Sequence, residues 1–249
     1  MENGMWDRFV AARERYRREL EKLRKRLPQL RALQQSFVDG RSQTYTVETP
    51  VVYNTALDAI GVDSEIRLIL IGDNPGRREQ ARGNRRYLVG PSGKIAEKFF
   101  REQPSLHIDF RTNVIILNKT PIHSPRTGDL KELCRLGGTA FAAALEQSQR
   151  CMAGLLLEFH EALINHQGLP VPVWITGYSE MKRGGIFETY TEELRRLYSA
   201  SSLQQSVFLY RHFSMNQFTI DLKRQAIPGE TLHKTLNRIG TAYRKRFLW

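Results

Sequence analysis

The sequence has few cysteines and no long apolar run, and these two absences exclude several classes of protein. Its 249 residues include only two cysteines, Cys134 and Cys151, and their spacing fits neither a zinc site nor an iron–sulfur cluster. The six histidines also lack metal-ligand spacing, so we expect no metal and no other cofactor. No apolar stretch approaches the ~20 residues of a membrane-spanning helix, and the first residues contain no signal-peptide core. We therefore expect a cytoplasmic protein.

Positive charge, in contrast, is abundant. Lysine and arginine total 38 against 26 aspartate and glutamate residues, which gives a formal net charge of +12 at pH 7. Such an excess attracts polyanions, and nucleic acid is the commonest partner of this kind. The alternative is a basic protein without a nucleic-acid partner, because net charge bears on association and not on fold.

Four short apolar segments alternate with helical patterns over most of the chain. We expect strands at residues 67–71, 113–117, 171–176 and 207–210, and helices at residues 95–101, 138–165, 187–198 and 233–249. This alternation is typical of right-handed βαβ crossovers. It predicts an α/β, three-layer αβα fold with a four-stranded parallel central sheet. Pro172 predicts that the third strand begins late or lies near an edge.

The first part of the chain is predicted to be a helical arm. Apolar residues recur at helical spacing from residue 5 to about residue 37, and Pro28 is expected to divide or kink this helix. We therefore expect an N-terminal helical arm at residues 1–40 and one α/β domain at residues 41–249. The arginines of the arm either contact phosphates or form a solvated face with Glu14, Glu19 and Glu21.

Polar sequence follows three of the four predicted strands. The first strand leads into Gly72–Gly76, the second into Asn118–Pro121 and the fourth into Arg211–Asn216. A further glycine-rich turn, Leu88–Gly93, opens onto a predicted helix. Because parallel strands present their carboxyl ends at one edge of the sheet, these segments are predicted to line one cleft.

These segments, in this order, resemble the motifs of the uracil-DNA glycosylase superfamily over residues 66–218. Members carry a Gly-x-x-Pro-Gly/Tyr turn after the first strand, an Asn after the second and a His-Pro-Ser-type loop after the last. The resemblance implies an enzyme that hydrolyses the N-glycosidic bond of uracil or a related deaminated base in DNA and leaves an abasic site. It excludes the iron–sulfur branch, whose four cysteines are missing.

The resemblance also assigns roles at the site. Asp73, Asn74 or both would orient the water, although the two polar side chains could also form an Asx turn. Gly72, at the start of the same turn, would lie against the bound base. Asn118 would read the Watson–Crick edge of a flipped base, or else cap a turn. His212 would donate toward the base as negative charge develops, or else be structural.

Two positions depart from the family pattern. Leu88 stands where the family has an aromatic platform for the base, so either Tyr87 enters the pocket or base selection differs. Phe213 replaces the usual proline of the last loop. Met215 would be the wedge that enters the minor groove, or would pack beneath the loop with Phe218. We expect DNA contacts from Arg77, Arg78, Arg85, Arg86, Ser92, Ser214, Met215 and Asn216.

Two other functions compete with a glycosylase. Residues 90–94 superficially resemble a phosphate-binding loop, but Leu88 and Ile95 break the required pattern and disfavour a nucleotide hydrolase. The stronger alternative is a non-catalytic nucleic-acid-binding protein that retains the glycosylase fold. Its basic surface would persist for binding, and Leu88 would mark a lost base pocket.

Overall fold

The protein is an α/β structure built around one parallel sheet, as the sequence predicts. The computed structural model describes residues 1 and 3–249. Its strands are β1 (Leu68–Gly72), β2 (Val114–Asn118), β3 (Val173–Thr176) and β4 (Val207–Tyr210). They form a four-stranded sheet in the order β2-β1-β3-β4, with every neighbouring pair parallel. β3 begins directly after Pro172, which confirms its predicted late start.

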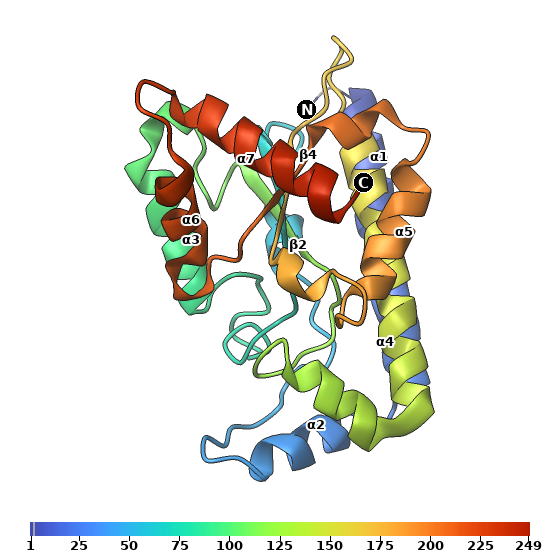
Figure 1. The fold of residues 1–249 in the computed structure, drawn as a ribbon. Coiled ribbons are helices and arrows are strands. Elements are labelled where there is room, and N and C mark those ends of the chain that lie inside the picture. The colour runs from blue at the N-terminus through green and yellow to red at the C-terminus, as the bar shows by residue number, and fades with distance from the viewer. Residues whose placement is uncertain (2) are drawn as a thin grey trace.

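Helices cover both faces of the sheet (Figure 1). They are α1 (Asn3–Arg26), α2 (Leu30–Asp39), α3 (Pro91–Glu102), α4 (Asp129–Ala162), α5 (Glu188–Tyr198), α6 (Gln217–Gln225) and α7 (Leu232–Phe247). Ile69 and Ile71 of β1 belong to the core that α1, α4 and α5 share, whereas Leu68 and Leu70 belong to the core beneath α3, α6 and α7. Every β1 side chain is buried, which explains why β1 reads as a continuous apolar run.

The predicted helices are present, although α3 begins at Pro91, four residues before its predicted start, and larger differences occur at two places. α4 begins nine residues before the predicted start, at Asp129 rather than at residue 138, and Gly138 kinks it with φ +63° and ψ −160°. The sequence does not predict α6, whose first residues fall where the family resemblance places the wedge loop. Asn216, at its start, adopts a left-handed φ of +57° and makes no side-chain capping bond, so the usual start signal is lacking. Pro28 does divide the arm, into α1 and α2.

The N-terminal arm is part of the core. Phe9, Tyr16 and Leu20 of α1 are fully buried, and α1 packs along α4. On its outer side, Glu14 forms an ion pair with Arg17, and Glu19 pairs with Lys22 at 2.7 Å. Of the two alternatives for the charged residues of the arm, phosphate contact or a solvated face, this part of the arm therefore has the solvated face. Within the described residues, no helix is both long and apolar enough to cross a membrane.

A buried pair of tyrosines ties the arm to the sheet domain. The hydroxyls of Tyr16 and Tyr87 lie 2.6 Å apart, and the Tyr87 hydroxyl donates to the carbonyl oxygen of Val52 at 2.7 Å. Burial raises the pKa of both phenols, so both stay protonated and serve as donors. With Tyr87 donating to Val52, Tyr16 must donate to Tyr87.

The two tyrosines predict unequal losses of stability. We expect Tyr16→Phe to lower the free energy of unfolding by about 1 kcal/mol, because it removes one hydrogen bond and leaves no donor unpaired. Tyr87→Phe strands both the Tyr16 hydroxyl and the Val52 carbonyl, and we expect a loss nearer ~2–3 kcal/mol. Urea denaturation of the two variants measures the difference; equal losses would contradict this arrangement.

Candidate active site

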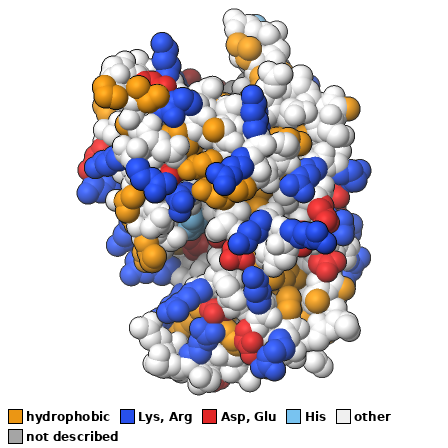
Figure 2. Space-filling view, viewed as in Figure 1, with side chains coloured by type: hydrophobic (Ala, Val, Ile, Leu, Met, Phe, Trp, Pro, Cys, Tyr) orange, Lys and Arg blue, Asp and Glu red, His pale blue; other side chains and the backbone are white. Residues whose placement is uncertain are grey.

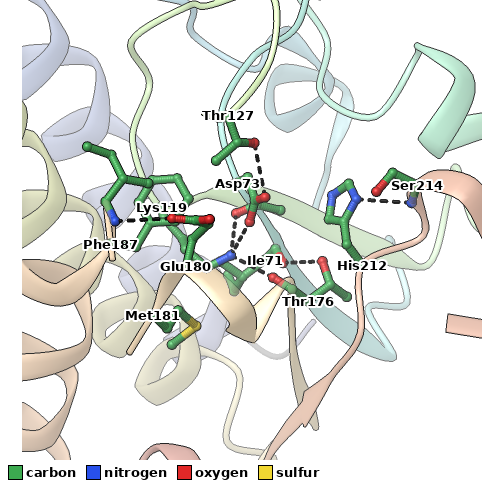
Figure 3. Close-up of polar contacts among 12 residues, drawn as sticks. Ile71, Asp73, Lys119, Thr127, Thr176, Glu180, Met181, Phe187, His212 and Ser214 are labelled. Carbon is green, nitrogen blue, oxygen red and sulfur yellow. Dashed lines mark hydrogen bonds and ion pairs between the residues drawn. The ribbon is translucent and has the colours of Figure 1, made fainter. Parts of the chain in front are cut away.

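The carboxyl ends of the strands meet at one edge of the sheet. Gly72 at the end of β1 is in register with Asn118 at the end of β2. Beyond β3, the amide of Gly177 donates to the carbonyl oxygen of Tyr210 at the end of β4, at 3.0 Å. The segments that follow β1, β2 and β4 therefore converge there. Asn118 lies at this edge by its register with Gly72, and Figure 3 shows Asp73 and His212 on the same edge.

A buried ion pair lies at the centre of this edge. The Nζ of Lys119 is 2.5 Å from Oδ1 of Asp73, and the Thr127 hydroxyl donates to Oδ2 at 3.1 Å. Lys119 is fully buried and also donates to the carbonyl oxygens of Thr176 at 2.6 Å and Gly72 at 3.4 Å. An ammonium group has three protons, so these acceptors satisfy it completely.

The surroundings fix the charge of Asp73. Burial alone would raise the pKa of its carboxyl group, but Lys119 and His212, with the hydrogen bonds from Lys119 and Thr127, bring that pKa below its usual value. Burial lowers the pKa of Lys119, and the Asp73 carboxylate opposes that shift. Asp73 is therefore a carboxylate at neutral pH, held against an ammonium group beneath it.

Two glycines allow this close packing. Gly177 has a φ of +79°, and a side-chain carbon built on it would lie 2.6 Å from Oδ1 of Asp73. A side-chain carbon on Gly72 would lie 2.6 Å from Oδ1 of Asn118. Any larger residue at either place would displace a polar group of the site.

Asn74 is held by the segment after β2. Its amide nitrogen donates to the hydroxyl of Ser124 at 2.9 Å and to the carbonyl oxygen of Pro75 at 3.3 Å. His123 fixes the same carbonyl, with Nδ1 2.8 Å from the Pro75 oxygen. The Asp73 carboxylate binds Lys119 and Thr127, so these contacts differ from the Asx turn considered as an alternative.

Asn118 has an unpaired amide. The residue is only 2% exposed, and its Nδ2 has no hydrogen-bond partner among the described residues. An orphaned buried donor costs about 1–3 kcal/mol, so native proteins rarely keep one without a reason. The amide next to Gly72 thus retains donor capacity that the protein itself does not use.

His212 is neutral and has a defined tautomer. Its Nδ1 accepts a hydrogen bond from the backbone amide of Ser214 at 3.0 Å (Figure 3). Burial lowers the pKa of the imidazole; Asp73 opposes the shift and Lys119 reinforces it. A neutral ring with an accepting Nδ1 carries its proton on Nε2. His212 therefore presents an N–H donor beside the Asp73 carboxylate.

The segment after β4 exposes one of its apolar side chains and buries two others. Met215 is 78% exposed, and both Met215 and Asn216 adopt left-handed φ values, of +50° and +57°. Phe213 and Phe218 are buried and stack with ring centres 4.4 Å apart. The alternative in which Met215 packs beneath the loop is therefore wrong, although it holds for Phe218. Ser214 is half-buried beside His212.

The expectation that Tyr87 enters the base pocket is wrong. Its side chain is 1% exposed, and its hydroxyl is used by Val52 and Tyr16 on the side of the arm. Leu88 is also buried, at 6% exposure, and has a φ of +51°. A buried carboxyl group, Glu79, secures this turn by accepting from Gly76 at 3.0 Å. Burial raises its pKa to about 7, despite hydrogen bonds from Gly76, Leu88 and the following residue.

The predicted DNA-contacting arginines lie on the surface. The loop between the two turns of the first motif carries five arginines that are wholly or partly exposed: Arg77, Arg78, Arg82, Arg85 and Arg86. Ser92, the second residue of α3, is half-buried. Figure 2 shows lysine and arginine side chains spread widely over one face, with fewer acidic side chains between them. These positions are compatible with phosphate contact.

Sequence reasoning missed two residues of the ion-pair cluster. Lys119 had a signal, because a lysine directly after the buried strand β2 requires a charged or polar partner. Thr127 had none, because its bond to Asp73 spans 54 positions of the chain. No protein-family model matches the chain, and no curated protein matches its sequence.

Removing Lys119 should be costly. We expect Lys119→Met to lower the free energy of unfolding by about 3–5 kcal/mol, because it leaves a buried carboxylate without its cation. Adding Asp73→Asn should restore part of that loss, since an amide requires no counter-charge. Urea denaturation measures both variants. If the free energy of unfolding of Lys119→Met alone lies within ~1 kcal/mol of that of the unmodified protein, the result argues against the pairing of Lys119 with Asp73.

Two buried histidines predict acid sensitivity. Burial lowers the pKa of His123 and of His160 to about 4, against hydrogen bonds that raise it. Unfolded histidine titrates near ~6.5, so the unfolded chain binds more protons between these values, and stability falls as pH falls through that window. From pH 7 to pH 5 each histidine should remove about 2 kcal/mol. In urea titrations at both pH values, His160→Gln should weaken this dependence; an unaltered dependence would contradict it.

Proposed function

We propose that the protein is a monofunctional DNA glycosylase that removes uracil or a related deaminated base and leaves an abasic site. The observation that carries the proposal is the placement of Asp73, Asn118 and His212 at one sheet edge, from segments far apart in the chain. One is a carboxylate, one has an unpaired amide and one is a neutral N–H donor. Cleavage of an N-glycosidic bond requires these kinds of groups around the sugar and the base.

The carboxylate of Asp73 suits the sugar side of the reaction. As the bond to the base breaks, the sugar becomes an oxocarbenium-like cation, which a nearby carboxylate stabilises. Each Asp73 oxygen already accepts one hydrogen bond and can accept another from a water. Asn74 supports the same water, because Ser124 holds its amide nitrogen and leaves its carbonyl oxygen to accept a hydrogen bond from the water. We assign the water to this pair jointly.

Asn118 and His212 suit the base side. The Asn118 amide offers a donor to O4 of uracil and an acceptor to N3–H, the pairing that distinguishes uracil from cytosine. His212, through Nε2–H, donates toward O2 as negative charge develops on the departing base. A neutral imidazole is sufficient for this role, because it stabilises the anion without transferring a proton.

The contacts of Lys119 favour hydrolysis over lyase chemistry. A lyase requires an unprotonated amine that attacks C1′ of the sugar. Lys119 is the lysine beside Asp73, and it is fully buried with its three protons donated to Asp73, Thr176 and Gly72. Exposed Met215 suits the wedge that fills the gap left by the extruded nucleotide.

One observation favours the second candidate, a DNA-binding protein without catalysis. Tyr87 packs toward the arm, so the turn that carries it contributes no aromatic platform for a flipped base. The absence of such stacking costs about 1–3 kcal/mol. That cost weakens the binding of a flipped base. Measured cleavage distinguishes a glycosylase from a DNA-binding protein without catalysis.

The test is cleavage of uracil-containing oligonucleotides, single- and double-stranded, with alkali to reveal abasic sites. We expect His212→Leu to reduce turnover about a hundredfold or more, because the anion loses its donor. Asp73→Asn combined with Asn74→Ala should abolish cutting while DNA affinity is retained, because the amide at residue 73 keeps an oxygen for the buried Lys119 ammonium. His233→Leu, an exposed histidine on α7, is the matched control and should cut normally.

Two results would decide against the proposal. Turnover that is unchanged in His212→Leu and in the double variant would remove these residues from the reaction. Tight DNA binding by the unmodified protein, with no abasic product from either substrate, would favour the non-catalytic candidate.

A further inference from the structure

Two adjoining hollows lie beside the loop at residues 77–86. One has a volume of about 460 Å³ and is lined by Arg24 and Arg31 of the arm and by Arg82 and Arg85 of the loop. The other, of about 310 Å³, is lined by Arg77 and Arg78. Glu48 lines both hollows and thereby joins them. We call these six arginines the arginine track.

The positive charge of the track is not neutralised internally. Among the described residues, none of its six arginines forms an ion pair with an acidic side chain. Glu48, the acidic residue in the lining, accepts a hydrogen bond from the backbone amide of Arg82 at 2.6 Å. Elsewhere on the arm, arginines such as Arg17 pair with neighbouring carboxylates. The track therefore differs from the ordinary charged surface of this protein.

A buried glutamine holds the two sides of the track together. Gln80 is 3% exposed, and its Oε1 accepts from the amides of Glu48 at 2.6 Å and Thr49 at 3.1 Å. Its Nε2 donates to the carbonyl oxygen of Thr46 at 3.1 Å. The arginine loop is thus fastened to the segment that leads out of the arm.

The far end of the loop is held in an unfavourable conformation. Arg85 has a φ of +40°, a region that residues other than glycine rarely adopt. The amide and the hydroxyl of Thr55 both donate to the Arg85 carbonyl oxygen, at 2.9 and 3.1 Å. Such strain persists only where the surroundings enforce it, and it gathers at functional sites.

The arm arginines are held by backbone and keep donors to spare. Arg24 donates one N–H to the carbonyl oxygen of Val51 at 2.9 Å, and Arg31 donates one to the carbonyl oxygen of Glu48. A guanidinium group has five N–H donors in a fixed plane, which match the oxygens of a phosphate. Orientation by the backbone leaves the other donors for a ligand.

We propose that the arginine track binds backbone phosphates of a DNA strand next to the candidate active site. The loop starts directly after Pro75 and Gly76 of that site, so a strand whose target nucleotide lies at Asp73 continues along the loop toward the arm. The arm then has a function of its own, which is to hold DNA that flanks the reacting nucleotide. The inference rests on the proposed function only in taking DNA as the ligand.

The test uses the full chain and a fluorescein-labelled DNA duplex without uracil. Binding is followed by fluorescence anisotropy over a series of salt concentrations. We expect Arg24→Gln combined with Arg31→Gln to weaken binding about tenfold at low salt. The slope of log affinity against log salt should fall by about 0.9 for each phosphate that the protein no longer neutralises, or about 2 in all.

The matched control removes the same charge elsewhere. Arg8 and Arg101 are exposed, on α1 and at the end of α3, and Arg8→Gln with Arg101→Gln should leave the slope nearly unchanged. If the two double variants weaken binding equally, the effect is one of net charge alone and the proposal is overturned. An unchanged salt slope in Arg24→Gln with Arg31→Gln would also overturn it. The duplex contains no uracil and is not cleaved, so this binding assay is independent of the cleavage assay. If the protein binds through the track but cleaves no uracil-containing substrate, the proposed glycosylase function is refuted and this inference still holds.

Discussion

The site depends on one buried ion pair, between Asp73 and Lys119. Lys119 joins the ends of three strands. The residue directly follows β2, and its ammonium group binds the carboxylate of Asp73 after β1 and the carbonyl oxygen of Thr176, the last residue of β3. Removing two charges from water is expensive, and only close geometry with further hydrogen bonds offsets that expense. The three acceptors of Lys119 and the Thr127 hydroxyl meet this requirement, so the loops at the edge have little freedom to adopt another arrangement.

The sheet was predictable because its residues obey strong local rules. The apolar run Leu68–Gly72 is buried on both faces, and its sudden polar ending marks the carboxyl edge of a parallel strand. Pro28 and Pro172 marked boundaries for the same local reason. α6 was not predictable in this way, because its first turn lacks a capping side chain and follows two left-handed residues. The early start of α4 was hidden by Gly138, which is typical of a helix end and here forms a kink.

The site was less predictable because its partners are set by tertiary structure. The sequence indicated that Asp73 and His212 would lie at one edge, since topology alone brings strand ends together. It did not indicate that Lys119 would neutralise Asp73, or that Ser214 would fix the tautomer of His212. Tyr87 was misassigned because a residue in a turn has no periodicity to reveal which side it faces. Its true contact, Tyr16, lies 71 positions earlier in the chain.

The arm has a consequence for how this chain is synthesised. α1 ends at Arg26, whereas α4, against which it packs, begins only at Asp129. A ribosome therefore releases the apolar face of α1, with Phe9 and Leu20, long before the covering helix exists. Contacts this distant in sequence form late and slowly, and exposed apolar surface invites association in the meantime. The apolar face of α1 therefore remains uncovered during synthesis until the residues of α4 have been added.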